Sequence, residues 1–385
     1  MNAPVLKTGM GLEFHRGFES LPLRRSPLET NGVVAWFQRN HGHPFGLDQR
    51  GFESLPLTLR HKRSGYIRIM NPGPLDGLHH ITAITGDAAA NVDFYTRVLG
   101  LRLIAKTVNQ DDPTVYHLFY ADEHARPGLD LTFFEYPHAA PGRAGAGMVH
   151  TVVWRVASDE ALTFWDERLK AEGVPVTREA TSVHFKDGEG LAHELIINST
   201  DDIPLVADHP EIKPEVALQG FEGVRAYSAH LEGSQLMLDE LMGAERLDDE
   251  HGVRYEFRAQ RRGGWIAFDE APAELGTQGA GVIHHVAWAT TDADLQGWID
   301  HVNANKVPNS GFVDRHYFHS LYFREPGGIL YELATLEPGF TVDGLSVEEL
   351  GTKIILPPRL EPMRELVEAK LTPLPDPRAD WPSGQ

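Results

Sequence analysis

Two pairs of adjacent histidines and one glutamate are the residues of this sequence best suited to bind a metal ion. The pairs are His79-His80 and His284-His285, and Glu332 lies in a strand-like run, residues 329–333. One histidine of each pair and this carboxylate would form a facial triad, which holds Fe(II) in non-heme oxygenases and leaves coordination positions open for substrate and O2. Side chains alternate between the two faces of a strand, so we expect only one histidine of each pair to enter the site. The alternation alone does not say which one.

Both histidine pairs lie at the start of a repeated unit. Four segments begin alike, roughly 60 to 75 residues apart: Gly77-Leu78-His79-His80, Gly147-Met148-Val149-His150, Gly223-Val224-Arg225-Ala226 and Gly281-Val282-Ile283-His284. A helix-like stretch and then strand-like runs follow each segment, so the sequence predicts one supersecondary unit repeated four times. Only the first and fourth units carry a histidine pair.

The first unit shows the plan most clearly. Asp87 fits a helix N-cap, the run 94–99 supplies an apolar helix face, and Gly100 fits the position after the helix. Strand-like runs follow at 101–108, 115–121 and 129–135, which gives a β-α-β-β-β module. Ser158 and Thr291 are the expected N-caps of the second and fourth helices.

The segments that separate the units suggest the domain organisation. We expect a first domain over residues 77–201, containing modules one and two, and a second domain over 221–340, containing modules three and four. Residues 202–220, with three prolines, read as the linker. A C-terminal tail over 341–385 is expected to hold one docked helix, at 360–371, and a loose end from Pro373.

Composition excludes several classes of function. The net charge of −20 argues against nucleic acid and anionic membranes as partners, because both require a basic face. The absence of cysteine removes disulfides, thiolate catalysis and Cys-ligated metals, so any metal must be held by His and carboxylate. There is no apolar run of about 18 residues and no signal-peptide pattern, which predicts a cytoplasmic protein. The oligomeric state is left open, with a homo-oligomer as one outcome.

The modules and their motifs resemble the vicinal oxygen chelate superfamily. The resemblance is carried by the opening run 78–82, Leu-His-His-Ile-Thr, and by the closing run 331–335, Tyr-Glu-Leu-Ala-Thr. Segments 106–113 and 116–120, with Pro326-Gly327-Gly328, are similar to the ring-cleaving dioxygenases that open para-diphenols, meaning hydroquinones and chlorohydroquinones. The resemblance implies an α+β fold in which four βαβββ modules pair into two barrel-like domains.

The resemblance also implies an activity and a set of ligands. It implies an Fe(II)-dependent, extradiol-type dioxygenase that opens a small aromatic substrate with O2, with Mn(II) as a substitute metal. In the family pattern the metal binds the second histidine of each pair, which gives His80, His285 and Glu332 here. An ion held in this way keeps a charge of about +1, which favours a substrate that binds as a phenolate.

Three further residues receive roles from the same resemblance. Tyr322 would hydrogen-bond the substrate oxygen, and Arg315 would stabilise negative charge as it develops. His79 would shuttle a proton or orient the site.

The inner two modules lack this chemistry in sequence. Thr151 and Tyr227 match the ligand histidines there, and Glu194 matches Glu332 without them. We therefore expect the second site to be vestigial, and we expect His150 and His193 to be packing residues.

Two other functions are open on the same fold. A glyoxalase-type isomerase or lyase uses four protein ligands around zinc or nickel, and Glu135 could supply the fourth. A non-enzymatic protein could instead sequester an aromatic compound or an antibiotic.

The N-terminal 69 residues read as a disordered leader without strand or helix period. The heptapeptide at 17–23 recurs verbatim at 51–57, and its Gly-Phe-Glu-Ser can be back-translated to a tRNA T-arm sequence. We therefore predict that the biological start is Met70 and that residues 1–69 are not translated and are dispensable. The intact mass of the native protein tests the start, and folding of a chain that begins at Met70 tests dispensability.

Overall fold

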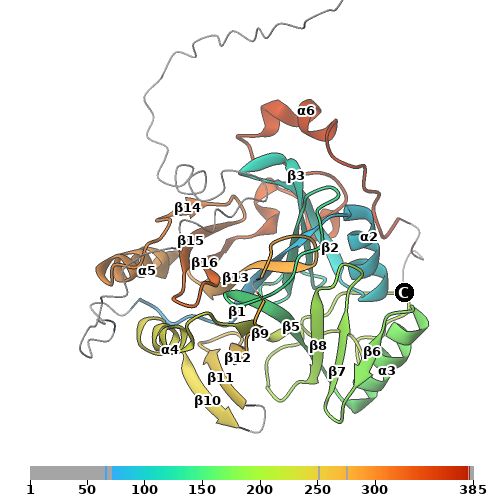
Figure 1. Cartoon of the computed structure of the whole chain (residues 1–385). Helices are drawn as coiled ribbons and strands as arrows, with labels where there is room; N and C mark the ends of the chain where they lie inside the picture. The colour runs from blue at the N-terminus through green and yellow to red at the C-terminus, as the bar shows by residue number, and fades with distance from the viewer. Residues whose placement is uncertain (1–65, 67–71, 250–251, 275, 380, 382–385) are drawn as a thin grey trace, which may run out of the picture. The chain divides into compact units, whose positions relative to one another are not determined.

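The computed structural model describes residue 66 and residues 72–249, 252–274, 276–379 and 381 (Figure 1). Except for Tyr66, the expected leader lies outside the described residues, as does the expected start at Met70. No helix among the described residues is long and apolar enough to cross a membrane.

Each of the four predicted modules forms one strand, one helical segment and three further strands. The first comprises β1 (Leu78–Thr85), α2 (Ala88–Asp93) with the π-helical turn η2 (Phe94–Val98), β2 (Arg102–Asn109), β3 (Asp112–Ala121) and β4 (Asp130–Glu135). The second comprises β5 (Met148–Val156), α3 (Asp159–Ala171), β6 (Val176–Arg178), β7 (Ser182–Lys186) and β8 (Ala192–Ile197). The third comprises β9 (Phe221–Tyr227), α4 (Leu231–Leu236) with η3 (Met237–Leu241), β10 (Glu245–Asp249), β11 (Gly252–Phe257) and β12 (Gly264–Asp269). The fourth comprises β13 (Val282–Thr290), α5 (Asp292–Ala304), β14 (Val313–Asp314), β15 (Phe318–Arg324) and β16 (Leu330–Pro338).

The predicted helix caps are confirmed. Asp87, Ser158 and Thr291 each accept a hydrogen bond from a backbone N–H in the first turn of the helix that follows. These bonds satisfy N–H groups that have no partner within the helix. Gly100 has φ +72°, a left-handed conformation in which a glycine ends the helical segment without steric cost.

The sheets confirm that the modules are paired, but the partners differ from the expected ones. One eight-stranded sheet has the order β14-β15-β16-β13-β1-β4-β3-β2, and the other has the order β10-β11-β12-β9-β5-β8-β7-β6. Module one therefore shares a sheet with module four, and module two shares a sheet with module three. We call these sheets the first and second half-barrel. The expectation that modules one and two form one domain, and modules three and four the other, is corrected by this topology.

The correction has a physical cause in the first strand of each module. All four first strands are rich in buried apolar residues and offer an edge for antiparallel pairing, so the hydrophobic pattern does not distinguish one partner from another. The structure pairs β1 with β13 and β5 with β9. The inner pair of modules is thus enclosed within the outer pair along the chain, and the segment 198–220 connects the two inner modules.

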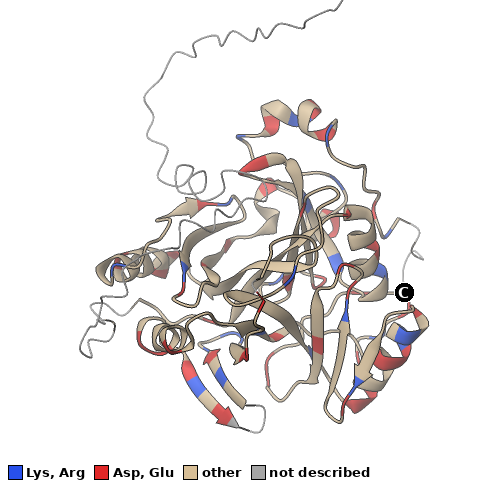
Figure 2. Cartoon of the chain, viewed as in Figure 1, with Lys and Arg blue, Asp and Glu red and all other residues tan. Residues whose placement is uncertain are grey.

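Alternation along the strands separates the main core from the inner face of the first half-barrel. In β13, Val286 and Trp288 belong to the main apolar core, whereas Ala287 belongs to a second cluster with Phe119, Phe318 and Ala334. The helix α5 packs on β15 and β16, and α3 packs on β7 and β8. Figure 2 shows acidic and basic residues interspersed along α3 and α6.

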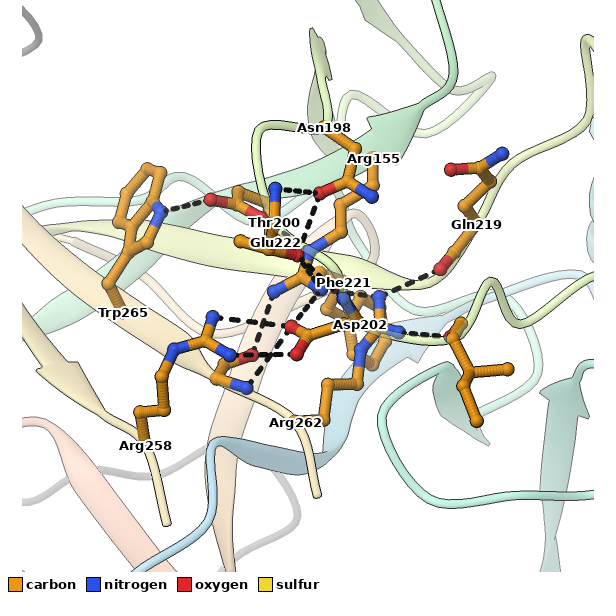
Figure 3. Close-up of polar contacts among 12 residues, drawn as sticks. Arg155, Asn198, Thr200, Asp202, Gln219, Phe221, Glu222, Arg258, Arg262 and Trp265 are labelled. Carbon is orange, nitrogen blue, oxygen red and sulfur yellow. Dashed lines mark hydrogen bonds and ion pairs between the residues drawn. The ribbon is translucent and has the colours of Figure 1, made fainter. Parts of the chain in front are cut away.

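A cluster of buried charges ties the segment 198–220 to the second half-barrel (Figure 3). Arg155 of β5 is 1% exposed and forms ion pairs with Asp202 and Glu222. Arg258 also binds Asp202, with Nη1 2.7 Å from Oδ1. Trp265 Nε1 donates to Glu222 Oε1 at 3.1 Å. Arg155, Asp202 and Glu222 therefore each have an oppositely charged partner, which offsets the cost of burying them.

The tail after β16 is more ordered than the sequence suggests. Its described residues form three short 3-10 helices and one α-helix, α6 (Arg364–Glu368), which lies inside the predicted helix at 360–371. The end beyond Pro373 was expected to be loose, but Arg378 forms an ion pair with Glu123 at 2.9 Å and its guanidinium lies 4.6 Å from the centre of the Trp381 ring.

His193 links modules one and two through the core, and it is a packing histidine as predicted. Trp154 Nε1 donates to His193 Nδ1 at 3.1 Å, so His193 carries its proton on Nε2. That nitrogen lies 3.1 Å from the hydroxyl of Tyr95, which in turn donates to Asp187 at 2.8 Å. Burial lowers the pKa of His193 to about 3.

This buried histidine predicts a loss of stability in mild acid. The unfolded chain protonates His193 below about pH 6.5 while the folded protein does not, so its contribution is complete above that pH and is lost toward pH 3. Relative to His193→Gln, the wild type should lose roughly 2 kcal/mol of unfolding free energy between pH 6.5 and 5. Urea denaturation measures this, with the less buried His184→Gln as the control. Parallel pH profiles for wild type and His193→Gln would refute it.

Candidate metal centre

Three side chains from three strands converge on the inner face of the first half-barrel. They are His80 on β1, His285 on β13 and Glu332 on β16, and all three are buried. His80 Nε2 lies 3.3 Å from His285 Nε2. Glu332 Oε2 lies 3.1 Å from the first of these nitrogens and 3.0 Å from the second. These are the residues that the family pattern selects from the two histidine pairs.

The triangle of atoms fits a divalent cation. Two ligand atoms held at a right angle, each about 2.1 Å from an ion, lie about 3.0 Å apart, which is close to all three edges of this triangle. Glu332 Oε2 is buried and has no hydrogen-bond partner of acceptable geometry in the part of the chain that the structure describes. A buried carboxylate oxygen without such a partner is costly, and a cation would satisfy it. Two imidazoles and a carboxylate are the donor set of Fe(II) and related ions.

Two β-bulges bring both histidines of each pair to the site. Between β1 and β13, Leu78 pairs with Trp288 and His80 with Ala287, so His79 is an extra residue in β1. Thr82 pairs with His285 and Ala83 with Ile283, so His284 is an extra residue in β13. The simple alternation assumed from sequence does not hold at the bulges, because each extra histidine packs against its neighbour instead of pointing to the opposite face. Only one histidine of each pair belongs to the ligand cluster, as expected.

The extra histidines fix the orientation of the inner ones. His79 Nδ1 lies 3.0 Å from His80 Nδ1, and His284 Nδ1 lies 2.8 Å from His285 Nδ1. When Nε2 of His80 binds an ion, its proton is on Nδ1 and is donated to His79. His79 then carries its own proton on Nε2, which lies 3.1 Å from the backbone oxygen of Thr335. This arrangement holds the ring of His80 with its lone pair directed at the triangle.

The ionisation states suit a cation. Burial, reinforced by the charge of His80, lowers the pKa of His79 to about 3. Burial also lowers the pKa of His285, so the imidazole is neutral and its lone pair is available. For Glu332, burial alone would raise the pKa, but His80 and His285 outweigh it and hold the pKa well below its usual value. Ser320 donates to the other carboxylate oxygen at 2.5 Å.

Tyr322 and Arg315 lie beside the triad as a pair. Tyr322 is opposite Glu332 in the sheet, and its ring centre lies 5.9 Å from that of His285. Arg315 Nε donates to the Tyr322 hydroxyl at 3.2 Å. Burial raises the pKa of Tyr322, so the hydroxyl stays protonated at neutral pH and can donate a hydrogen bond. The structure therefore brings together the residues expected to bind metal and those expected to handle the substrate.

Sequence reasoning missed several residues that line this face. Ser320 and His284 were not selected, although Ser320 stands two residues from Tyr322 and therefore on the same face of β15. His117 was not selected either, and its Nε2 lies 3.0 Å from the hydroxyl of Thr132, which lies 2.8 Å from the hydroxyl of Thr82. Phe318 covers the triad from one side, with ring centres 4.9 Å from His80 and 5.2 Å from His79.

The second half-barrel has a different set of residues at the same register. Gly223 pairs with Val153 as His80 pairs with Ala287, so Gly223, and not Tyr227, is the counterpart of His80. A Cβ atom at Gly223 would lie 2.3 Å from the ring of Trp265, which fills that space. Glu194 does occupy the register of Glu332, as expected. Among the described residues, only the first half-barrel brings three possible ligands together.

Glu135, the possible fourth ligand of a glyoxalase-type site, does not join the triad. It follows Phe134 in β4 and so points to the opposite face, where it lies near Ala88 and Asp87. The cluster of described ligand atoms contains three residues and not four.

Comparisons with known proteins agree with this fold. The family model described as Glyoxalase/Bleomycin resistance protein/Dioxygenase superfamily matches residues 77–204 and 236–333. A Bacillus subtilis protein named ring-cleaving dioxygenase MhqA is 38% identical over 318 residues, covering 78% of this chain and 99% of the relative. Chlorohydroquinone/hydroquinone 1,2-dioxygenase of Sphingobium indicum is 33% identical over 316 residues, covering 76% and 95%. A crystal structure of a Bacillus subtilis protein titled as a dioxygenase is 37% identical, with a TM-score of 0.73, covering 78% of this chain and 98% of that one.

The triad predicts metal binding that depends on each of its three members. His80→Ala, His285→Ala and Glu332→Ala should each lose stoichiometric Fe(II) or Mn(II) after anaerobic loading and desalting, measured by elemental analysis. His150→Ala is the matched control, because His150 is the extra residue of the corresponding bulge in the second half-barrel. Retention of one equivalent of metal by His285→Ala, with an unchanged circular dichroism spectrum, would remove His285 from the ligand set.

Proposed function

The chain belongs to the Glyoxalase/Bleomycin resistance protein/Dioxygenase superfamily and is an enzyme of the ring-cleaving dioxygenase kind; from this premise we propose that it is an Fe(II)-dependent, extradiol-type dioxygenase that opens para-diphenols. The observation that carries the proposal is the convergence of His80, His285 and Glu332 beside Tyr322. The named activity of the Sphingobium relative supports hydroquinones or chlorohydroquinones as the substrate class.

In this proposal His80, His285 and Glu332 hold the ion. A bound Fe(II) would supply Lewis acidity toward a phenol and a place for O2. A divalent ion held by two imidazole nitrogens and one carboxylate would keep about one positive charge, which favours a substrate that has lost a hydroxyl proton.

The remaining side chains orient the substrate and balance charge. A hydroquinone offers one oxygen to the ion, unlike a catechol, so protein groups must fix its orientation. The Tyr322 hydroxyl is protonated and supported by Arg315, which makes it a hydrogen-bond donor toward an oxygen that gains negative charge. The buried cluster of Phe119, Tyr317, Phe318 and Phe340 makes the surroundings of the triad apolar and aromatic on the same side of the sheet.

His79 has an orienting role in this proposal, and it is a poor candidate for a proton shuttle. Its two ring nitrogens contact His80 and the backbone oxygen of Thr335, and it is 2% exposed. A group with both nitrogens engaged in this way holds His80 in one tautomer, as is usual for the outer partner of a metal-binding histidine.

Oxygen consumption tests the proposal against its alternatives. Protein loaded anaerobically with Fe(II) is assayed with hydroquinone, chlorohydroquinone, catechol and the hemithioacetal of methylglyoxal and glutathione. We expect O2 uptake with the para-diphenols, faster than with catechol. Isomerisation of the hemithioacetal without O2 uptake would favour a glyoxalase-type enzyme, and tight binding of an aromatic without turnover would favour a binding protein.

Tyr322→Phe tests the role of the hydroxyl, because it keeps the ring and removes one oxygen. If the hydroxyl stabilises the transition state, kcat should fall roughly 10- to 1000-fold with a smaller change in KM. Tyr331→Phe is a matched control: Tyr331 is buried in the adjacent strand, and its hydroxyl has no hydrogen-bond partner among the described residues. Equal kcat values for Tyr322→Phe and the wild type would exclude this role.

A further inference from the structure

The C-terminal tail crosses the outer edge of the first half-barrel as a strap, which we define as residues 340–379. It lies along β2, the last strand of that sheet: Ile354 forms a parallel bridge with Lys106, and the N–H of Ile355 donates to the Lys106 oxygen at 2.9 Å. Further along the strap, the backbone oxygen of Thr372 accepts from the Tyr116 hydroxyl at 2.8 Å. Figure 1 shows α6 of the strap beside β3. The strap thus covers a strand edge whose backbone groups would otherwise be unpaired.

One contact of the strap leads directly to the backbone of Arg315. Arg359 Nη2 donates to Gln110, to Oε1 at 2.9 Å and to the backbone oxygen at 3.1 Å. The amide nitrogen of the same Gln110 side chain donates to the backbone oxygen of Arg315 at 2.7 Å. Gln110 lies in the turn between β2 and β3, so the strap and this turn hold the Arg315 backbone together.

A second contact of the strap holds the next residue. His316 has φ +72°, a left-handed conformation that a residue other than glycine rarely adopts. Its backbone N–H donates to Asp314 Oδ1 at 2.7 Å, and its ring Nε2 lies 2.7 Å from Asp343 Oδ1 of the strap. The peptide group between Arg315 and His316 is therefore held on both sides. Gln110 binds the backbone oxygen of Arg315, and Asp343 binds the ring of His316.

The side chain of Arg315 transmits this anchoring to the candidate site. Its Nη1 lies 3.0 Å from Asp111 Oδ2, in the same turn as Gln110. Its Nε donates to the Tyr322 hydroxyl at 3.2 Å, and the guanidinium lies 5.2 Å from the centre of the Tyr322 ring. A displacement of the 310–318 segment would therefore move the group that supports the Tyr322 hydroxyl.

We propose that the C-terminal strap positions side chains of the active site. Arg359 and Asp343 are the positioning residues, and they act through Arg315 on Tyr322. The proposal rests on the role given to Tyr322 in the proposed function. Arg359 and Gln110 meet at the surface, where a lost hydrogen bond costs little stability, so their contact serves geometry more than folding. Small displacements of a positioned group are enough to slow a reaction considerably.

The experiment compares two arginines of the same strap. Arg359→Ala and Asp343→Asn should each lower kcat roughly 10-fold with little change in KM, because a misplaced Tyr322 affects the transition state more than binding. Arg378→Ala is the matched control: Arg378 anchors the strap to Glu123 by an ion pair of 2.9 Å, and among the described residues it forms no hydrogen bond or ion pair with Gln110, Arg315 or His316. Arg359→Lys should recover most of the activity, since Arg359 uses only its Nη2 toward Gln110.

A double variant identifies the route of the effect. In a Tyr322→Phe background, Arg359→Ala should cause little further loss of kcat, because the hydroxyl through which it acts is already absent. Independent, multiplicative losses would overturn the proposal, as would equal losses for Arg359→Ala and Arg378→Ala.

Hydrogen–deuterium exchange makes the proposal testable without activity. The amides of residues 310–318 should exchange faster in Arg359→Ala than in Arg378→Ala or the wild type, while the amides of β13 should not change. Unchanged exchange in this segment would overturn the positioning role even if the enzyme is active. Faster exchange in a protein that consumes no O2 with para-diphenols would support the anchoring of this segment and reject the proposed function.

Discussion

The first half-barrel is organised by the need to hold three lone-pair-bearing atoms about 3 Å apart in a dry interior. His80 and His285 are 205 residues apart in the chain, and they meet because β1 and β13 pair antiparallel. Glu332 joins them because β16 pairs with β13 on the other side. Without a cation the cluster would leave a buried carboxylate oxygen without a proper donor. Module pairing, the two bulges and the ionisation of the triad are all consistent with this single requirement.

Much of this could be predicted from particular residues. Asp87, Ser158 and Thr291 predicted where their helices begin, because N-capping is a local interaction. The histidine pairs and Glu332 indicated a candidate metal site by residue type. The hydrophobic pattern could not reveal the partner of each module. The expected triad did require modules one and four to be neighbours, because His80 and His285 can share one ion only if they lie close together. The extra residues His79 and His284 were also out of reach, because a bulge is visible only in the register of two paired strands.

The second half-barrel shows how one backbone plan supports different chemistry. The bulge that holds His284 in β13 holds His150 in β5, and the bulge that holds His79 in β1 holds Glu222 in β9. Glu222 there forms an ion pair with Arg155 and accepts from Trp265. Gly223 and Trp265 together occupy the volume where a ligand histidine would stand. The inner pair of modules therefore contributes packing and buried ion pairs, and its register alone does not create a metal site.

The nesting of one module pair inside the other also sets an order of assembly during synthesis. Thr151 and Arg225, paired across the inner sheet, are 74 positions apart (225 minus 151), whereas His80 and His285 are 205 apart. Closing the longer loop costs about 1 kcal/mol more chain entropy. More directly, a growing polypeptide exposes the inner modules while β13 and β16 are still unmade. The second half-barrel can therefore fold while synthesis continues. The ligand set can form only when β16 has emerged from the ribosome, so a chain truncated before β16 cannot assemble the metal centre.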